Sequence, residues 1–205
     1  MITKKQLAIV LSRLKTFENP KLLLEQYSTD SEIASEILWN AFMSNELEGK
    51  KIADLGSGTG ILGIGALILG ANELYFIDVN SEAMDILKEN LQNVKKEFQI
   101  KGKSHFLVQD IEDFGEKVDL VIENPPFGTK KEHADKKFIE KAFSISNKVY
   151  SFHKASSNSF IEAISRDKCF KIKQVWNFDF PLKASYGFHK KKMQRIAVSC
   201  WKLGK

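Results

Sequence analysis

The chain has 205 residues, of which 43% are hydrophobic, and this favours a single domain over residues 1–205 with a sizeable core. No apolar run reaches the roughly 18 residues that a membrane-spanning helix needs, and residues 1–17 lack the apolar centre of a signal peptide. Because Cys169 and Cys200 match no metal-binding spacing, we expect a cytoplasmic protein without a metal site of its own.

The formal net charge of +5 is distributed unevenly along the chain. Residues 1–129 contain 13 Lys and Arg against 20 Asp and Glu, whereas residues 130–205 contain 18 against 6. The second segment therefore carries a net charge of +12. A basic segment of this strength in a small domain favours a polyanionic partner, although basic surfaces without such a partner are also common.

The first 45 residues predict a helical N-terminal cap. Apolar residues at helical spacing predict a helix over residues 3–17, and Asn19-Pro20 ends it. A connector over residues 22–29 follows. Asp30 or Ser31 can cap a second helix that reaches about residue 43.

Strands then alternate with helices through residues 46–205, the segment that we expect to form the catalytic sheet. The predicted strands cover 51–55, 73–77, 105–108, 118–122 and 149–152, and the predicted helices cover 61–69, 82–98 (capped by Ser81), 135–146 and 156–165. Two longer strands, over 170–180 and 193–202, have no convincing helix between them, which suggests one antiparallel strand. The pattern predicts an α/β fold with a seven-stranded, mostly parallel, Rossmann-like sheet and helices on both faces.

An unusual corner, Asn124-Pro125-Pro126-Phe127, follows the predicted strand over 118–122. Prolines donate no backbone hydrogen bond and keep the preceding residue extended, so carbonyl oxygens are free to face a cleft. The amide of Asn124 supplies a further carbonyl, and Phe127 supplies a flat ring. These groups suit a planar molecule with an NH2 group. A turn that merely ends the strand is the alternative interpretation.

A glycine loop, Gly56-Ser57-Gly58-Thr59-Gly60, follows the strand that contains Asp54. Ligands of open α/β sheets bind at the carboxyl ends of the strands, where acidic residues also follow the next two strands. We expect Asp54 to hold an amino group through the loop, Asp78 to accept from a ribose diol, Asp110 to accept from an adenine amine, and Val79 to pack on the base. Ile61 stands where the dinucleotide motif requires a third glycine, which disfavours a nicotinamide dehydrogenase.

Together, D-L-G-S-G-T-G, the acidic strand ends and N-P-P-F resemble the class I methyltransferases that use S-adenosylmethionine. More closely, four segments are similar to the methyltransferase-like protein five family and its archaeal relatives, namely residues 24–29, 124–130, 151–154 and 185–192. The similarity covers about residues 20–200. That family methylates adenine N6 in small-subunit ribosomal RNA, so the resemblance implies the same activity here.

The resemblance also implies a role for each matching position. The stretch around Gln26, Tyr27 and Thr29 would close over the methionine part of the cofactor, and N-P-P-F would form the adenine pocket. The expected catalytic residues are Asn124, Pro125, Pro126 and Phe127. The expected cofactor-binding residues are Gln26, Tyr27, Thr29, Asp54, Gly56, Ser57, Gly58, Gly60, Asp78, Val79, Asp110, Ile111 and Asn124.

The basic segment suggests contacts with RNA, because Lys190, Lys191 and Lys192 lie beside the aromatic residues Phe188 and Tyr186 in the sequence. The expected RNA-binding residues are Lys130, Lys131, His153, Lys154, Phe188, Lys190, Lys191 and Lys192, and we also expect Lys136 and Lys137 to hold flanking phosphates. The resemblance further implies a small zinc-containing activator protein, docked by strand addition along a sheet edge. In the usual strand order that edge is the strand over 105–108, which carries no charge to guard it.

Other functions remain open from the residues alone. A protein glutamine amide and the adenine of DNA are also planar and carry an NH2 group. An inactive RNA-binding subunit could retain the same fold. The intact Asn124, Asp54 and Asp78 argue against inactivity, and the basic segment argues against a protein substrate.

Overall fold

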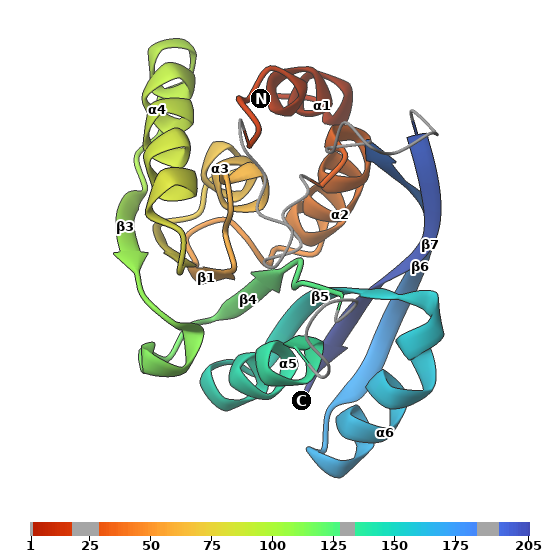
Figure 1. Cartoon of the computed structure of the whole chain (residues 1–205). Coiled ribbons are helices and arrows are strands. Elements are labelled where there is room, and N and C mark those ends of the chain that lie inside the picture. The colour runs from red at the N-terminus through yellow and green to blue at the C-terminus, as the bar shows by residue number, and fades with distance from the viewer. Residues whose placement is uncertain (1, 18–28, 128–133, 184–192) are drawn as a thin grey trace.

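The computed structural model describes residues 2–17, 29–127, 134–183 and 193–205 (Figure 1). The strands among these residues form one sheet with the strand order β3-β2-β1-β4-β5-β7-β6. Its strands are β1 (Lys51–Leu55), β2 (Glu73–Asp78), β3 (Lys103–Val108), β4 (Leu120–Glu123), β5 (Lys148–Lys154), β6 (Lys171–Lys183) and β7 (Met193–Gly204). The strands from β3 to β5 pair in parallel, whereas β7 is antiparallel to both β5 and β6. The predicted mostly parallel, seven-stranded sheet and its one antiparallel strand are confirmed.

Helices cover both faces of this sheet, as predicted (Figure 1). One hydrophobic cluster joins the sheet to α1 (Lys4–Ser12), α2 (Ser31–Met43), α3 (Ile61–Ile68) and α4 (Ser81–Glu97). A second cluster joins the opposite face to α5 (Ala134–Ile145), α6 (Asn158–Asp167) and the short helix η2 (Ile111–Asp113). A further short helix, η3 (Ala155–Ser157), precedes α6. Within the described part of the chain, no helix combines the length and apolarity that spanning a membrane requires.

The N-terminal helix is shorter than its apolar spacing predicted. Thr3 and Gln6 form a capping box at the start of α1, but the helix ends at Ser12 and Arg13 is its C-cap. Residues 14–17 therefore follow a non-helical path. At α4 the N-cap is Asn80 rather than the predicted Ser81, because the side chain of Asn80 accepts from the backbone N–H of Glu82.

The edge strand β3 begins two residues earlier than predicted, at Lys103. The expectation of an uncharged edge is therefore wrong at its start, where Lys103 is exposed. His105 is also paired, because its Nε2 lies 2.9 Å from Oε1 of Glu73 on β2. Val108 at the far end is 51% exposed. The expected position of this strand at one edge of the sheet is confirmed.

The sheet reverses its strand order between β1 and β4, which both pair in parallel. Open α/β sheets bind ligands outside the carboxyl ends of strands at such a point. Leu55, the last residue of β1, is aligned with Glu123, the last residue of β4. The glycine loop and the Asn124 corner therefore leave the sheet side by side.

Candidate functional site: the carboxyl ends of β1, β2 and β4

A glycine-rich turn joins the end of β1 to α3. Gly58 and Gly60 have φ values of 52° and 93°, a left-handed conformation that favours glycine. A Cβ atom at Gly60 would lie 2.7 Å from Cγ of Leu87, so the turn has no room for a side chain there. The buried carboxylate of Asp54 accepts a hydrogen bond of 2.9 Å from the backbone N–H of Gly63. Asp54 therefore ties the start of α3 to β1, and burial raises its pKa to about 7.

Asp78 at the end of β2 holds the other side of the turn. One carboxylate oxygen accepts from the backbone N–H of Gly58 at 2.8 Å, and the other accepts from the backbone N–H of Asn80 at 2.8 Å. Burial raises the pKa of Asp78, and these backbone hydrogen bonds oppose that rise. A carboxylate oxygen can accept more than one hydrogen bond, so these contacts leave acceptor capacity toward a ribose. The neighbouring Val79 is 53% exposed, as a side chain that packs on a base would be.

Asp110 follows β3 and caps the short helix η2. One oxygen accepts from the backbone N–H of Glu112 at 2.9 Å, and the other lies 2.8 Å from Nζ of Lys137. Lys137 also pairs with the carboxylate of Glu112 at 3.0 Å. The side chain of Ile111 is 4% exposed and packs in the core on the α5 side of the sheet. Of the two expected cofactor contacts, only Asp110 therefore presents a polar side chain at the surface.

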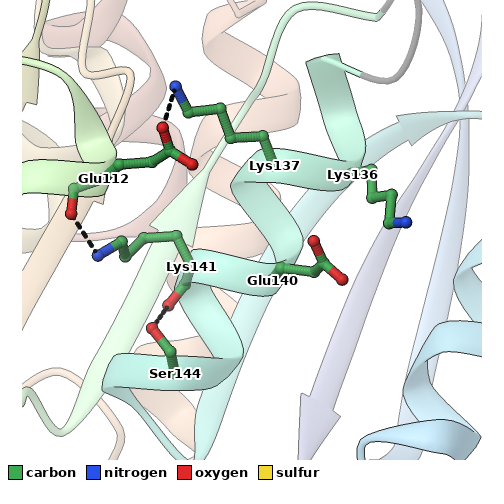
Figure 2. Close-up of a pocket in the computed structure, with 6 residues that line it drawn as sticks. All are labelled: Glu112, Lys136, Lys137, Glu140, Lys141 and Ser144. Atoms are coloured by element: carbon green, nitrogen blue, oxygen red, sulfur yellow. Dashed lines mark hydrogen bonds and ion pairs between the residues drawn. The ribbon is translucent and has the colours of Figure 1, made fainter.

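An open pocket of about 540 Å³ lies between η2 and α5, and Figure 2 shows the side chains that line it. Its walls are five charged residues and one serine that the sequence did not single out as a group, namely Glu112, Lys136, Lys137, Glu140, Lys141 and Ser144. Lys137 and Lys141 point toward η2, where Lys141 donates to the backbone oxygens of Glu112 and Phe114. Lys136 points away from η2. Lys136 and Lys137, both expected to hold phosphates, thus face different directions, and Lys137 is already paired with carboxylates.

The corner after β4 presents the one amide predicted to be catalytic. Asn124 Nδ2 donates a hydrogen bond of 2.9 Å to Oγ1 of Thr29, which lies just before α2. Asn124 Oδ1 is buried and has no hydrogen-bond partner among the described residues. Thr29 was expected to cover the cofactor, and here it fixes which way the amide faces. The arrangement leaves a carbonyl oxygen available to accept from a ligand.

Phe127 at the end of the corner is 7% exposed. Its ring meets the edge of Phe180 of β6 at a centroid distance of 6.5 Å, and Nζ of Lys154 lies 5.9 Å from its centroid. Lys154 therefore lies next to the corner, a position that is compatible with its predicted contact with RNA. Stacking of Phe127 on a base stays a prediction.

His153 departs from its predicted role. It was expected to contact RNA, but its side chain on β5 is completely buried. The prediction that His153 contacts RNA at the protein surface is therefore wrong. Its Nε2 lies 2.7 Å from Oγ of Ser151, and that Oγ lies 2.6 Å from Oε1 of Glu123. Sequence reasoning missed this row. The Ser-x-His spacing on one face of a predicted strand, beside an acid at the end of its neighbour, was the available signal.

Asn90 of α4 was also missed. Its side chain is 2% exposed and makes two hydrogen bonds with the backbone after α1. Its Oδ1 accepts from the backbone N–H of Lys15 at 2.8 Å, and its Nδ2 donates to the Lys15 carbonyl at 2.9 Å. The same Nδ2 donates to the carbonyl of Thr59 in the glycine loop at 3.0 Å. Phe17 packs against the loop, where a Cβ at Gly58 would lie 3.0 Å from its ring. One buried amide therefore connects the N-terminal segment to the loop.

The remaining predicted residues lie outside the described part of the chain. They are Gln26 and Tyr27 of the cofactor set, and Lys130, Lys131, Phe188, Lys190, Lys191 and Lys192 of the RNA set.

The described residues fit a nucleoside cofactor on the evidence of their own geometry. The glycine turn after β1 forms a concave surface that side chains at Gly58 and Gly60 would fill. The exposed apolar residue Val79 follows Asp78. Two buried polar atoms, Ser57 Oγ and Asn124 Oδ1, lack a hydrogen-bond partner within the described residues. Buried polar atoms are rarely left unpaired, so a ligand that supplies donors is expected between the two strand ends.

Comparisons with known proteins agree with this geometry. Residues 27–148 match the methyltransferase small domain family. The rRNA N(6)-adenosine-methyltransferase METTL5 of Danio rerio is 37% identical over 95% of this chain and 95% of its own. The uncharacterized protein MJ0284 of Methanocaldococcus jannaschii is 38% identical over 100% of this chain and 95% of its own. The crystal structure of PH1948 from Pyrococcus horikoshii, provisionally named an RNA methyltransferase, has a TM-score of 0.91 and 44% identity, and the match covers 100% of this chain and 98% of that one.

Proposed function

This chain belongs to the methyltransferase small domain family and, within it, to the family of the METTL5 proteins, and we propose that it methylates N6 of an adenine in small-subunit ribosomal RNA. The family assignment confirms the resemblance seen in the sequence, and the chain is an enzyme that depends on S-adenosylmethionine. The relatives of Danio rerio and Drosophila melanogaster are named rRNA N(6)-adenosine-methyltransferases, which supports RNA as the substrate class.

The observation that carries the proposal is the carbonyl oxygen of Asn124, which has no hydrogen-bond partner among the described residues. Thr29 holds the amide nitrogen, so the oxygen is oriented before any substrate arrives. An adenine amine brings two N–H donors in one plane. We propose that Asn124 Oδ1 accepts one of them and that the backbone carbonyl of Pro125 accepts the other. These two acceptors would stabilise the positive charge that develops on N6 during transfer.

The glycine turn and the acids around it would hold the cofactor. Asp78 would accept from the ribose hydroxyls beside Val79, Asp110 would accept from the adenine amine, and Gly56 to Gly60 would let the backbone approach closely. S-adenosylmethionine supplies an electrophilic methyl group on a positively charged sulfur. One carboxylate oxygen of Asp54 accepts from the backbone N–H of Gly63, and we propose that Asp54 acts on the cofactor through the position of the loop.

Phe127 would stack on the target base, an interaction worth about 1–3 kcal/mol in comparable complexes. The adenine has to be single-stranded or flipped out of a helix to reach the corner. Beyond these contacts, the main contribution of the site would be orientation, with the amine held in line with the methyl group at roughly 3–3.5 Å.

Some of the basic residues within the segment 130–205, Lys154 among them, would bind the phosphates around the target adenine. Lys154 is the described member of the predicted set that lies at the corner, since its ammonium group is 5.9 Å from the Phe127 centroid. We expect RNA affinity to fall steeply with salt, with a slope of roughly −0.7 per phosphate contact on single strands.

We also propose that β3 accepts a strand from a small zinc-containing activator protein. The position of β3 at the edge of the sheet and the exposed Val108 support this. Hydrogen exchange of the amides over 103–108 tests it, because strand addition would protect them when the two purified proteins are mixed. Unchanged exchange there would exclude this mode of docking.

The assay that tests the proposed function supplies labelled methyl groups and several acceptors in parallel. The acceptors are small-subunit ribosomal RNA, large-subunit ribosomal RNA, adenine-containing DNA and a protein release factor. We expect N6-methyladenosine after nuclease digestion of the small-subunit RNA alone. Label in the DNA or in a glutamine of the release factor would replace the proposal, and RNA binding without transfer would indicate an inactive subunit.

A further inference from the structure

A row of three buried polar side chains lies beneath the substrate corner on the α5 side of the sheet. Glu123 of β4 and Ser151 and His153 of β5 each have 0% of their surface exposed. Ser151 Oγ lies 2.6 Å from Glu123 Oε1 and 2.7 Å from His153 Nε2. At its far end, His153 Nδ1 lies 3.9 Å from Oδ2 of Asp135 in the first turn of α5. Neither Asn124 nor the glycine turn takes part in this row.

The row is connected to the first residue of the corner, Asn124, and to its last residue, Phe127. Glu123 is the last residue of β4 and the ladder partner of Ser151, and Asn124 follows it directly. His153 is followed by Lys154, whose ammonium group lies over the ring of Phe127. The side-chain contacts of Glu123, Ser151 and His153 therefore join the residue before the corner to the residue that contacts its end.

Burial keeps both titratable members of the row uncharged near neutral pH. Burial raises the pKa of Glu123 to about 8. The hydrogen bond with Ser151 opposes this rise, and the carboxylates of Asp54 on β1 and Asp135 on α5 support it. Burial lowers the pKa of His153 to about 3. The helix α3, which packs on the other side of β4, carries no titratable side chain. Near pH 7 the row is thus a protonated acid, a hydroxyl and a neutral imidazole.

The number of protons decides the direction of the hydrogen bonds. Ser151 has one hydroxyl proton, so it donates to one neighbour and accepts from the other. Ser151 donates to Oε1 of Glu123 when the acid is ionised. When Glu123 is protonated, Oε2 has no partner among the described residues, so the acid proton is satisfied only on Oε1, where it is donated to Ser151. Ser151 then donates to His153 Nε2, and the imidazole proton sits on Nδ1, facing the carboxylate of Asp135. Ionisation of Glu123 would reverse every bond in the row.

We propose that Glu123, Ser151 and His153 are positioning residues for methyl transfer, acting as a buried hydrogen-bonded relay that aligns Asn124 and Phe127 when it runs from Glu123 to His153. The inference rests on the proposed function for its kinetic part. Reversal of the relay removes the donor from the last residue of β4 and leaves a charge beneath the corner, and transfer slows.

The kinetic test compares two buried serines. Ser151→Ala breaks the relay, whereas Ser165→Ala removes a buried hydroxyl of α6 that has no partner among the described residues. We expect kcat of Ser151→Ala to fall about tenfold, the size expected for one lost buried hydrogen bond, with little change in KM for RNA or for S-adenosylmethionine. Ser165→Ala retains kcat. Equal kcat values for the two variants would overturn the proposal.

The pH profile separates positioning from simple support of the fold. Wild-type kcat is expected to fall as pH rises through about 8, where Glu123 ionises. Glu123→Gln keeps a neutral donor at this position, so we expect transfer without that alkaline fall, whereas Glu123→Ala loses transfer at every pH. A fall of the same size in Glu123→Gln, or loss of transfer by that variant at neutral pH, would contradict the relay.

A nuclear magnetic resonance test needs no methyl acceptor and therefore stands apart from the proposed function. With ¹⁵N-labelled protein we expect His153 to stay neutral at pH 7 with its proton on Nδ1, and to move the proton to Nε2 as Glu123 ionises. The side-chain amide signal of Asn124 should shift in Ser151→Ala and stay in place in Ser165→Ala. A His153 that carries its proton on Nε2 at pH 7, or an unmoved Asn124 signal, would overturn the relay even if the enzyme methylates ribosomal RNA. If the protein methylates none of the RNAs, these signals still decide the relay.

Discussion

Two neighbouring strand ends hold the two halves of this site by different means. Asp54 in β1 and Glu123 in β4 are both buried carboxyl groups, and burial raises the pKa of each, to about 7 and about 8. Asp54 is held by a backbone N–H, which can only donate. Glu123 is held by a hydroxyl, which can donate or accept. The main chain thus fixes the end that we propose binds the cofactor, whereas side chains fix the end that we propose binds the substrate.

This difference predicts that substitutions at the two ends affect different constants. Changes at the β1 end should appear in the binding of S-adenosylmethionine, because they move the glycine turn. Changes at the β4 end should appear in the transfer rate, because they move the acceptors for the target amine.

The largest effect is expected at the β4 end from Asn124→Ala. Loss of the carbonyl oxygen removes an oriented acceptor, so we expect kcat to fall by about 100- to 1000-fold while the dissociation constant for S-adenosylmethionine stays within a few-fold. Labelled transfer to ribosomal RNA and calorimetry measure the two quantities. Asn93→Ala, an exposed change on α4, is the matched control. Transfer by Asn124→Ala at the wild-type rate would remove the proposed role.

Asn90→Ala tests the β1 end. The substitution removes three hydrogen bonds that join the chain after α1 to the glycine turn. We expect the dissociation constant for S-adenosylmethionine to rise about tenfold, and kcat at saturating cofactor to change little. Calorimetry gives the first value and initial rates give the second, with Asn93→Ala again as control. An unchanged dissociation constant would show that the N-terminal segment does not support the turn.

The two carboxyl groups also predict how stability depends on pH. Their folded-state pKa values lie above the ordinary 3.8 and 4.5, so the folded protein retains protons that the unfolded chain has released. Their contribution is fully present below the unfolded pKa values and is lost as pH rises through the folded ones. His153 acts in the opposite direction only below its ordinary pKa of 6.5.

Urea unfolding between pH 6.5 and about 8.5 therefore isolates the carboxyl groups, and we expect stability to fall across this range. Glu123→Gln should flatten the fall more than Asp54→Asn does, because the pKa of Glu123 is the higher one. A wild-type stability that rises over the range would contradict the assignment of raised pKa values.

The smallest effect is expected from Lys154→Met at the β4 end. The ammonium group lies beside Phe127 and would contact a phosphate, so its loss should raise KM for RNA about two- to fivefold and reduce the salt slope by about 0.7. Filter binding at several salt concentrations measures both. Lys168→Met, an exposed lysine after α6, controls for the lost charge. Equal slopes in the two variants would argue against a phosphate contact at Lys154.

The sequence predicted much of the fold because its signals are local. Alternating apolar strand and helix patterns predicted the sheet, and the lack of a helical sequence pattern between residues 180 and 193 predicted the antiparallel strand. Boundaries failed where tertiary contacts compete with helical spacing, as at Arg13, after which Asn90 binds the backbone of Lys15 instead. Asn124, Asp54 and Asp78 were predicted from their places at strand ends: Asn124 directly follows β4, Asp78 ends β2, and Asp54 lies one residue before the end of β1.

The residue types of the site were thus determined by the sequence alone, since glycines, prolines and strand-end acids act through local backbone geometry. Only the tertiary structure decided how they are connected. His153 looked like a surface residue beside a lysine, and the structure buries it in a row with Ser151 and Glu123. Hydrogen bonds between separate strands depend on register and on which face each side chain takes, and no single segment of the chain carries that information.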